Sequence, residues 1–89
     1  MRYFMHICDG HGFVEDEEGR DLADDAAARE EAVAAARDIM ANDLRNGLLD
    51  LTSFIEVEDE TGKLLFAVTF AEAVTVGPPA SRPMRPPPG

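Results

Sequence analysis

Residues 24–47, DDAAAREEAVAAARDIMANDLRNG, decide the fold because they carry the one long helical pattern in the chain. They contain no proline and no glycine before Gly47, and alanine is the commonest residue. Asp24 is a good N-cap, Asp25 complements the positive end of a helix dipole, and Gly47 is the expected C′ residue. One side of the helical wheel is apolar, through Ala28, Ala32, Val33, Ala35, Ala36, Ile39, Met40 and Leu44. This pattern predicts an amphipathic helix over residues 25–45 whose small side chains let it lie close to whatever it covers.

Alternating apolar residues on both sides of this helix predict two β-hairpins. Before the helix, residues 2–8 predict a strand, residues 9–12 a glycine-rich turn and residues 13–15 a short returning strand. Residues 15–19 then form an acidic turn that is too polar to be buried. After the helix, two strands over residues 54–59 and 63–70 are joined by the turn Asp59-Glu60-Thr61-Gly62. Residues 71–76 are expected to continue as irregular edge structure.

The expected order is strand–strand–helix–strand–strand, which is an α+β fold (ββαββ). A mostly antiparallel sheet with the helix packed on one face is the simplest way to bury both apolar patterns. We therefore predict a single domain over residues 1–76. Residues 77–89 hold all six prolines and predict a disordered, partly polyproline-II tail.

Charge and composition argue against several classes of function. Residues 1–77 carry all 18 acidic and six of the eight basic side chains, a balance of −12, and Arg82 and Arg85 bring the total to −10. Such a surface repels phosphate backbones and anionic lipids. A single cysteine excludes an internal disulfide, and no apolar run predicts a membrane helix or a signal peptide. We expect a cytoplasmic protein with neither nucleic acid nor membrane as its partner.

Three clusters of residues resemble site motifs only weakly. His6, Cys8 and His11 spell H-x-C-x-x-H, but structural zinc sites take four ligands, usually as two separated pairs, and no second pair exists. A Cys8–histidine nucleophile pair lacks an orienting third group and an oxyanion-hole signature. The carboxylates of residues 15–18 and 24–25 could bind a cation, but their spacing does not match an EF-hand loop. The sequence leaves open whether the acidic turn binds a cation by another arrangement.

Simpler roles explain these residues, and no metal, cofactor or catalytic residue is predicted. His6 is expected to be a half-exposed strand residue, and Cys8 a small hydrophobic one. Arg29, near the start of the helix, is expected to tie the helix to an acidic segment, either the turn at Glu17-Glu18 or the neighbours of Glu31.

A series of short stretches in a fixed order carries a family resemblance. They are Arg2-Tyr3-Phe4, His6, Asp9-Gly10, Asp16-Glu17-Glu18-Gly19, Leu22, Asp24, Ala27-Ala28-Arg29, Glu31-Ala32, Leu49-Asp50-Leu51, Ile55-Glu56-Val57, Asp59-Glu60, Gly62, Phe70 and Glu72-Ala73-Val74. Over residues 2–76 the chain resembles a family of short bacterial proteins, mainly alphaproteobacterial, known as domain of unknown function 6894. The resemblance implies one cytoplasmic domain with no established activity, cofactor or ligand, so it transfers no catalytic residue. Met5 stands where an aromatic residue is common in the family.

Strand alternation also divides the predicted sheet into two faces. The residues expected to face the helix are Tyr3, Met5, Ile7, Ile55, Val57, Phe66 and Val68. The residues expected to face away from it are Phe4, His6, Cys8, Phe54, Leu65 and Ala67. Unless loops or the residues after Phe70 fold over it, this second face stays open in a monomer, because one helix cannot cover both sides.

We therefore expect a non-enzymatic interaction or structural protein that self-associates through this face, most simply as a homodimer. A module that binds a basic protein partner or a small ligand through its acidic surface is the first alternative. An enzyme or a metal-binding protein is the last.

Overall fold

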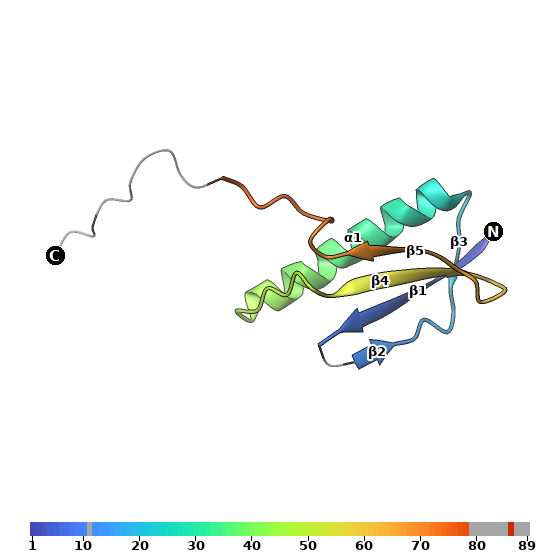
Figure 1. The fold of residues 1–89 in the computed structure, drawn as a ribbon, viewed down its shortest axis with the longest axis horizontal. Coiled ribbons are helices and arrows are strands. Elements are labelled where there is room, and N and C mark those ends of the chain that lie inside the picture. The colour runs from blue at the N-terminus through green and yellow to red at the C-terminus, as the bar shows by residue number, and fades with distance from the viewer. Residues whose placement is uncertain (11, 79–85, 87–89) are drawn as a thin grey trace.

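The structure is a computed structural model that describes residues 1–10, 12–78 and 86 (Figure 1). In these residues it has one helix, α1 (Asp25–Arg45), and five strands, β1 (Arg2–Asp9), β2 (Gly12–Val14), β3 (Arg20–Asp21), β4 (Phe54–Asp59) and β5 (Leu64–Thr69). The predicted α+β class is confirmed, because α1 packs on an antiparallel sheet. Most of the proline-rich segment lies outside the described residues, so its disorder stays a prediction. None of the described helical residues forms a segment long and apolar enough to cross a membrane.

The sheet has the strand order β2-β1-β4-β5, and every pairing is antiparallel. On one side β1 pairs with β4 over most of its length. On its other side β1 pairs with two short strands, β2 opposite residues 7–9 and β3 opposite residues 2–3. β3 has only two residues and no apolar alternation, so no pattern in the sequence predicts it. The other predicted strands are confirmed, with ends that differ by one residue at most.

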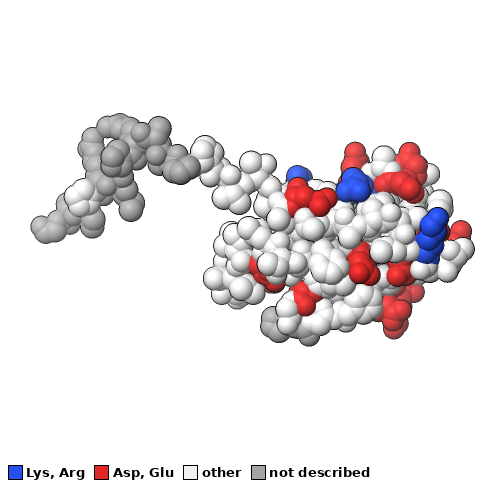
Figure 2. Space-filling view, in the orientation of Figure 1, with Lys and Arg blue, Asp and Glu red and all other residues white. Residues whose placement is uncertain are grey.

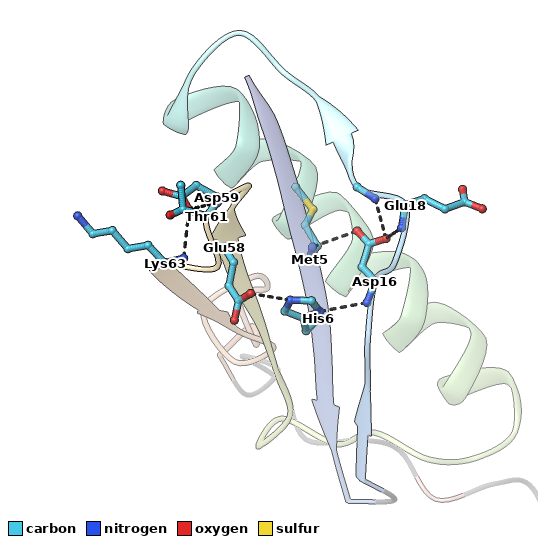
Figure 3. A network of polar contacts seen from close by, with 9 residues as sticks. Met5, His6, Asp16, Glu18, Glu58, Asp59, Thr61 and Lys63 are labelled. Atoms are coloured by element: carbon cyan, nitrogen blue, oxygen red, sulfur yellow. Dashed lines mark hydrogen bonds and ion pairs between the residues drawn. The ribbon is translucent and has the colours of Figure 1, made fainter.

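α1 begins and ends where the sequence predicts. The Asp24 carboxylate accepts a hydrogen bond from the Ala27 N–H at 2.8 Å, which caps the first turn. Gly47 has a φ of +82°, the left-handed conformation that favours glycine after a helix. The buried side of α1 consists of Ala28, Ala32, Ala36 and Met40. The three alanines let the helix lie close against β4 and β5, behind the sheet in Figure 3.

The core lies between α1 and one face of the sheet, as predicted. Five of the seven residues expected to face the helix are buried, and Ile7 and Phe66 pack against them. Phe70 and Ala73 complete this core. Residues 70–73 form a turn instead of edge structure, and the Arg37 Nε donates to the Ala73 carbonyl at 2.7 Å. Residues 70–73 therefore return on the helix side and do not cover the other face of the sheet.

Candidate functional site

The face of the sheet opposite α1, called the outer face below, is built by the register of β1, β2 and β4. Three rows of side chains cross it. Cys8 pairs with Phe13 on one side and Phe54 on the other, His6 pairs with Glu56, and Phe4 pairs with Glu58. On β5, Ala67 pairs with Glu56. Also on β5, Thr69 pairs with Phe54 and Leu64 with Glu58. The outer face thus consists of Phe4, His6, Cys8, Phe13, Phe54, Glu56, Glu58, Leu64, Ala67 and Thr69.

The residues predicted for this face are present but differ in their exposure. Phe4, Cys8 and Phe54 are half-buried, and Ala67 is exposed. Leu65 follows the irregular step at Val57/Glu58 and is partly buried against the core, so it is less available than simple alternation predicts.

His6 and Phe13 also depart from expectation on this face. The His6 side chain is not half-exposed: only 5% of the residue is accessible. Phe13 is 58% exposed, and its ring centroid lies 5.2 Å from that of His6. Phe13 is thus a large exposed aromatic residue of the outer face. In the structure Phe13 pairs with Cys8, which places it on the outer face. The pairing of the predicted returning strand with residues 2–8 is the sequence signal that could have placed it there.

A short hydrogen-bond network holds His6 in place (Figure 3). The Asp16 N–H donates to His6 Nδ1 at 3.0 Å, so Nδ1 carries the lone pair and Nε2 carries the ring proton. Nε2 lies 3.1 Å from Glu58 Oε2 and donates to it. Both ring nitrogens are therefore hydrogen-bonded. The bond from His6 of β1 fixes the position of the Glu58 carboxylate on β4.

The Asp16 carboxylate fixes the acidic turn against β1. It accepts hydrogen bonds from the N–H groups of Met5 at 3.1 Å, Glu18 at 3.2 Å and Gly19 at 3.1 Å. Burial acts to raise the pKa of Asp16, but these backbone donors and nearby His6 outweigh it and hold that pKa below its ordinary value. Asp16 is half-buried and none of residues 15–19 is fully buried, as expected for so polar a turn.

The acidic turn also covers one end of the outer face. Gly19 has a φ of +72°, and a Cβ there would lie 2.9 Å from the Tyr3 carbonyl oxygen and 3.0 Å from the Phe4 ring. The Arg2 guanidinium donates to the Glu18 carbonyl oxygen at 2.6 Å. Loops thus fold over the Phe4 end of the face, while the Phe13–Cys8–Phe54 row stays open.

Carboxylates surround this end of the outer face. A shallow depression of about 340 Å³ lies over Phe4 and His6 and is lined by Glu15, Asp16, Glu17, Glu58, Asp59 and Glu60. Figure 2 shows acidic side chains over much of the right-hand half of the molecule, with a few Lys and Arg side chains among them and mostly uncharged surface toward the left. The site therefore combines one exposed aromatic side chain, Phe13, and two half-buried ones, Phe4 and Phe54, with a strongly negative rim.

A family model described as a domain of unknown function (DUF6894) matches residues 2–71. The chain belongs to this family. The match confirms the resemblance, although it ends at residue 71 instead of 76, and it includes every residue of the outer face. No curated protein and no solved structure matches the chain.

The surroundings of Cys8 disfavour its thiolate. Burial raises the pKa of the Cys8 thiol, and the nearby carboxylates of Glu56 and Asp9 raise it further, so the thiol is kept from ionising. Among residues 1–10, 12–78 and 86, no group of three or more His, Cys, Asp or Glu side chains is placed to hold a metal ion. His11, the third residue of the H-x-C-x-x-H motif, lies outside the described residues.

Arg29 has a different partner from the one expected. Its guanidinium lies 3.3 Å from the Glu72 carboxylate and 4.5 Å from the centre of the Phe66 ring. It therefore ties the helix to the chain after β5. The acidic turn is tied down by Arg2, and Arg20 just after it forms an ion pair with Glu31 of α1.

Proposed function

We propose that this domain is a protein-interaction module that binds a basic, partly apolar segment of another protein across its outer face. The observation that carries the proposal is the pairing of open aromatic side chains with carboxylates in the middle of the sheet. Phe13 and Phe54 lie in one row, and Glu56 and Glu58 lie in the next two. An arginine-rich segment with apolar residues between its charges matches this arrangement, because its arginines can pair with the carboxylates and its apolar residues can contact the aromatic rings.

The charges on the outer face favour such a partner over a second copy of the chain. A two-fold homodimer places the same surface patch against itself. Glu56, Glu58 and the carboxylates of the depression would then face their own counterparts, and like charges brought together in an interface oppose association. A cationic segment neutralises the same groups. The predicted homodimer through this face is thus the weaker of the two proposals.

The hydrogen bonds made by His6 support a role in binding instead of catalysis. The two ring nitrogens of His6 are already bonded to the Asp16 N–H and to Glu58. These groups shape a surface and keep Glu58 in position. Covering the remaining exposed area of Phe4, Phe13 and Phe54 contributes about 3 kcal/mol before association costs. The affinity therefore depends strongly on the carboxylates and falls with added salt.

Fluorescence anisotropy with a defined probe tests the proposal. The probe is a labelled peptide of alternating arginine and valine, and the control peptide has glutamate in place of arginine. We expect the arginine peptide alone to bind, and Glu56→Lys to weaken binding about tenfold. Asp38→Lys makes the same charge change at an exposed position on α1 and should have an effect of about twofold or less.

Two results would count against this function. One is the absence of binding by the arginine peptide at low salt. The other is an equal loss of affinity in Glu56→Lys and Asp38→Lys, which would indicate only a general attraction to a negatively charged chain.

A further inference from the structure

The free edge of β5 is the second unpartnered feature of the sheet. β5 ends the order β2-β1-β4-β5, and no other strand among the described residues pairs with its far side. The Phe70 N–H donates to the Ser53 carbonyl at 2.8 Å, and the register pairs Val68 with Ile55 and Phe66 with Val57. In an antiparallel ladder, alternate residues bond to the same neighbour. The backbone groups of Ala67 and Thr69 therefore point away from β4, toward the open edge.

This edge lacks the features that usually prevent strand pairing. Edge strands are commonly protected by proline, by charged side chains or by a bulge. Residues 64–71, LLFAVTFA, contain no proline and no charge, and Leu64 is 53% exposed. The irregular step opposite Val57/Glu58 falls at Leu65, near the beginning of β5, and leaves residues 66–69 regular.

The charges beside the edge are balanced, unlike those of the outer face. Lys63 precedes β5 and Glu72 follows it, so an antiparallel second copy brings Lys63 of one chain beside Glu72 of the other. The bordering flank of α1 carries charges of both signs, since Arg29 contacts Phe66 and Glu72, Arg37 contacts Ala73, and Glu30 lies beside them. A chain with a balance of −12 over residues 1–77 thus has a region where self-association meets little repulsion.

The same flank of α1 also has a groove that suits a second helix. It has a volume of about 530 Å³ and is lined by Ala26, Arg29, Glu30, Val33, Ala34 and Arg37. Small residues in the middle of a helix face permit close approach of another helix. A two-fold axis between Val33 and Ala34 places Arg37 of one copy opposite Glu30 of the other. The charges and the shape of this flank are thus self-complementary.

We infer that two copies of the chain pair through their β5 edges, which joins two sheets into one continuous sheet. Centred on Ala67, the antiparallel pairing sets Leu65 opposite Thr69, while the two α1 flanks meet on the helix side. Both outer faces then lie on the same side of the joined sheet and stay uncovered. The inference is independent of the proposed binding of a basic segment, because it uses a different surface.

Light scattering across a dilution series tests this inference. We expect the full-length chain to form a dimer with a Kd of about 1–100 μM, the range of a modest interface. Ala67→Pro removes an N–H that points away from β4, so it should weaken the dimer about tenfold or more while circular dichroism stays unchanged. Ala67→Val keeps the N–H and should dimerise like the wild type. Glu56→Lys, on the outer face, should also leave the dimer unchanged.

A charge swap keeps the inference testable if Ala67→Pro does not fold. Arg37→Glu should weaken the dimer, and the double variant Glu30→Arg/Arg37→Glu should restore it, because the opposite charges still meet across the two-fold axis. A wild type that stays monomeric at about 500 μM would overturn the inference and leave the edge to a strand of another protein. A dimer weakened by Glu56→Lys but not by Ala67→Pro or Arg37→Glu would place the interface on the outer face instead.

Discussion

Asp16 shows how one side chain can take the place of a strand residue. On one side of β1, β2 pairs with residues 7–9 and β3 pairs with residues 2–3. The Met5 N–H falls between them, and it donates to the Asp16 carboxylate instead of to a neighbouring strand. The same residue's N–H orients His6. Asp16 therefore connects the stability of β1 to the shape of the outer face.

Replacing Asp16 should destabilise the fold more than replacing its neighbours. Asp16→Asn keeps the size of the side chain but leaves backbone donors without a charged acceptor, so we expect the free energy of unfolding to fall by about 1–3 kcal/mol. Glu17→Gln, at an exposed position of the same turn, should change it by about 0.5 kcal/mol at most. Urea unfolding at pH 7 measures both. Equal effects would show that the network around Asp16 contributes little.

Lowered carboxyl pKa values also predict how stability depends on acid. Hydrogen bonds from Thr52 and Ser53 lower the pKa of Asp50 to about 2, and the pKa of Asp16 is lowered as well. A carboxyl whose pKa is lower in the folded chain stabilises it above the ordinary pKa, and this stabilisation is lost as the pH falls through the folded value. The Tm should therefore drop between about pH 4 and pH 2. Asp16→Asn should show a shallower drop, and an equally steep one would contradict the assignment.

Tyr3 gives a spectroscopic reading of the contact between β1 and α1. It is the single tyrosine of the chain, and its hydroxyl donates to the Asp25 carboxylate at 2.7 Å. This hydrogen bond and burial raise the pKa of Tyr3 to about 12. Stability linked to the hydroxyl should therefore be lost as the pH rises from about 10 through 12. Ultraviolet titration should show a lower pKa in Asp25→Asn, and an unchanged titration would exclude the contact.

At the scale of the element, Gly19 and Gly62 separate backbone conformation from close packing. Both have a positive φ, but a Cβ on Gly62 meets open space while one on Gly19 meets the Tyr3 carbonyl oxygen. Gly62→Ala should cost about 1 kcal/mol for its backbone conformation alone. Gly19→Ala adds a clash with backbone and should cost about 3 kcal/mol. Chemical denaturation compares the two directly, and similar losses would show that the acidic turn is loosely attached to β1.

The elements differ in how far the sequence predicts them. The caps of α1 and the two faces of the sheet depend on local spacing, so Asp24, Gly47 and the alternation in β1 and β4 predict them correctly. β3 and the partner of Arg29 depend on contacts between residues that are far apart in the sequence, and local patterns do not predict such contacts. Glu72 lies 43 residues from Arg29 in the chain. The buried state of His6 has the same origin, because Asp16, Phe13 and Glu58 come together on it only in the folded chain.

At the scale of the whole molecule, the charges divide the surface between two kinds of contact. The outer face is rich in carboxylates, whereas the β5 edge lies beside Arg29, Arg37 and Lys63. The balance of −12 over residues 1–77 should prevent binding to duplex DNA at physiological salt. Anisotropy with a labelled duplex should stay flat, and salt-sensitive micromolar binding would contradict this expectation.

Chemical-shift mapping by NMR is the most direct test of the central claim that the outer face is a binding surface for basic segments. The ¹⁵N-labelled full chain is titrated with the arginine–valine peptide, and the glutamate–valine peptide serves as the control. We predict that the largest shift changes occur at the amides of Phe4, Cys8, Phe54 and Glu56, with little change along the exposed side of α1. Changes that concentrate on α1, or that spread evenly over the acidic residues of the whole chain, would contradict the claim.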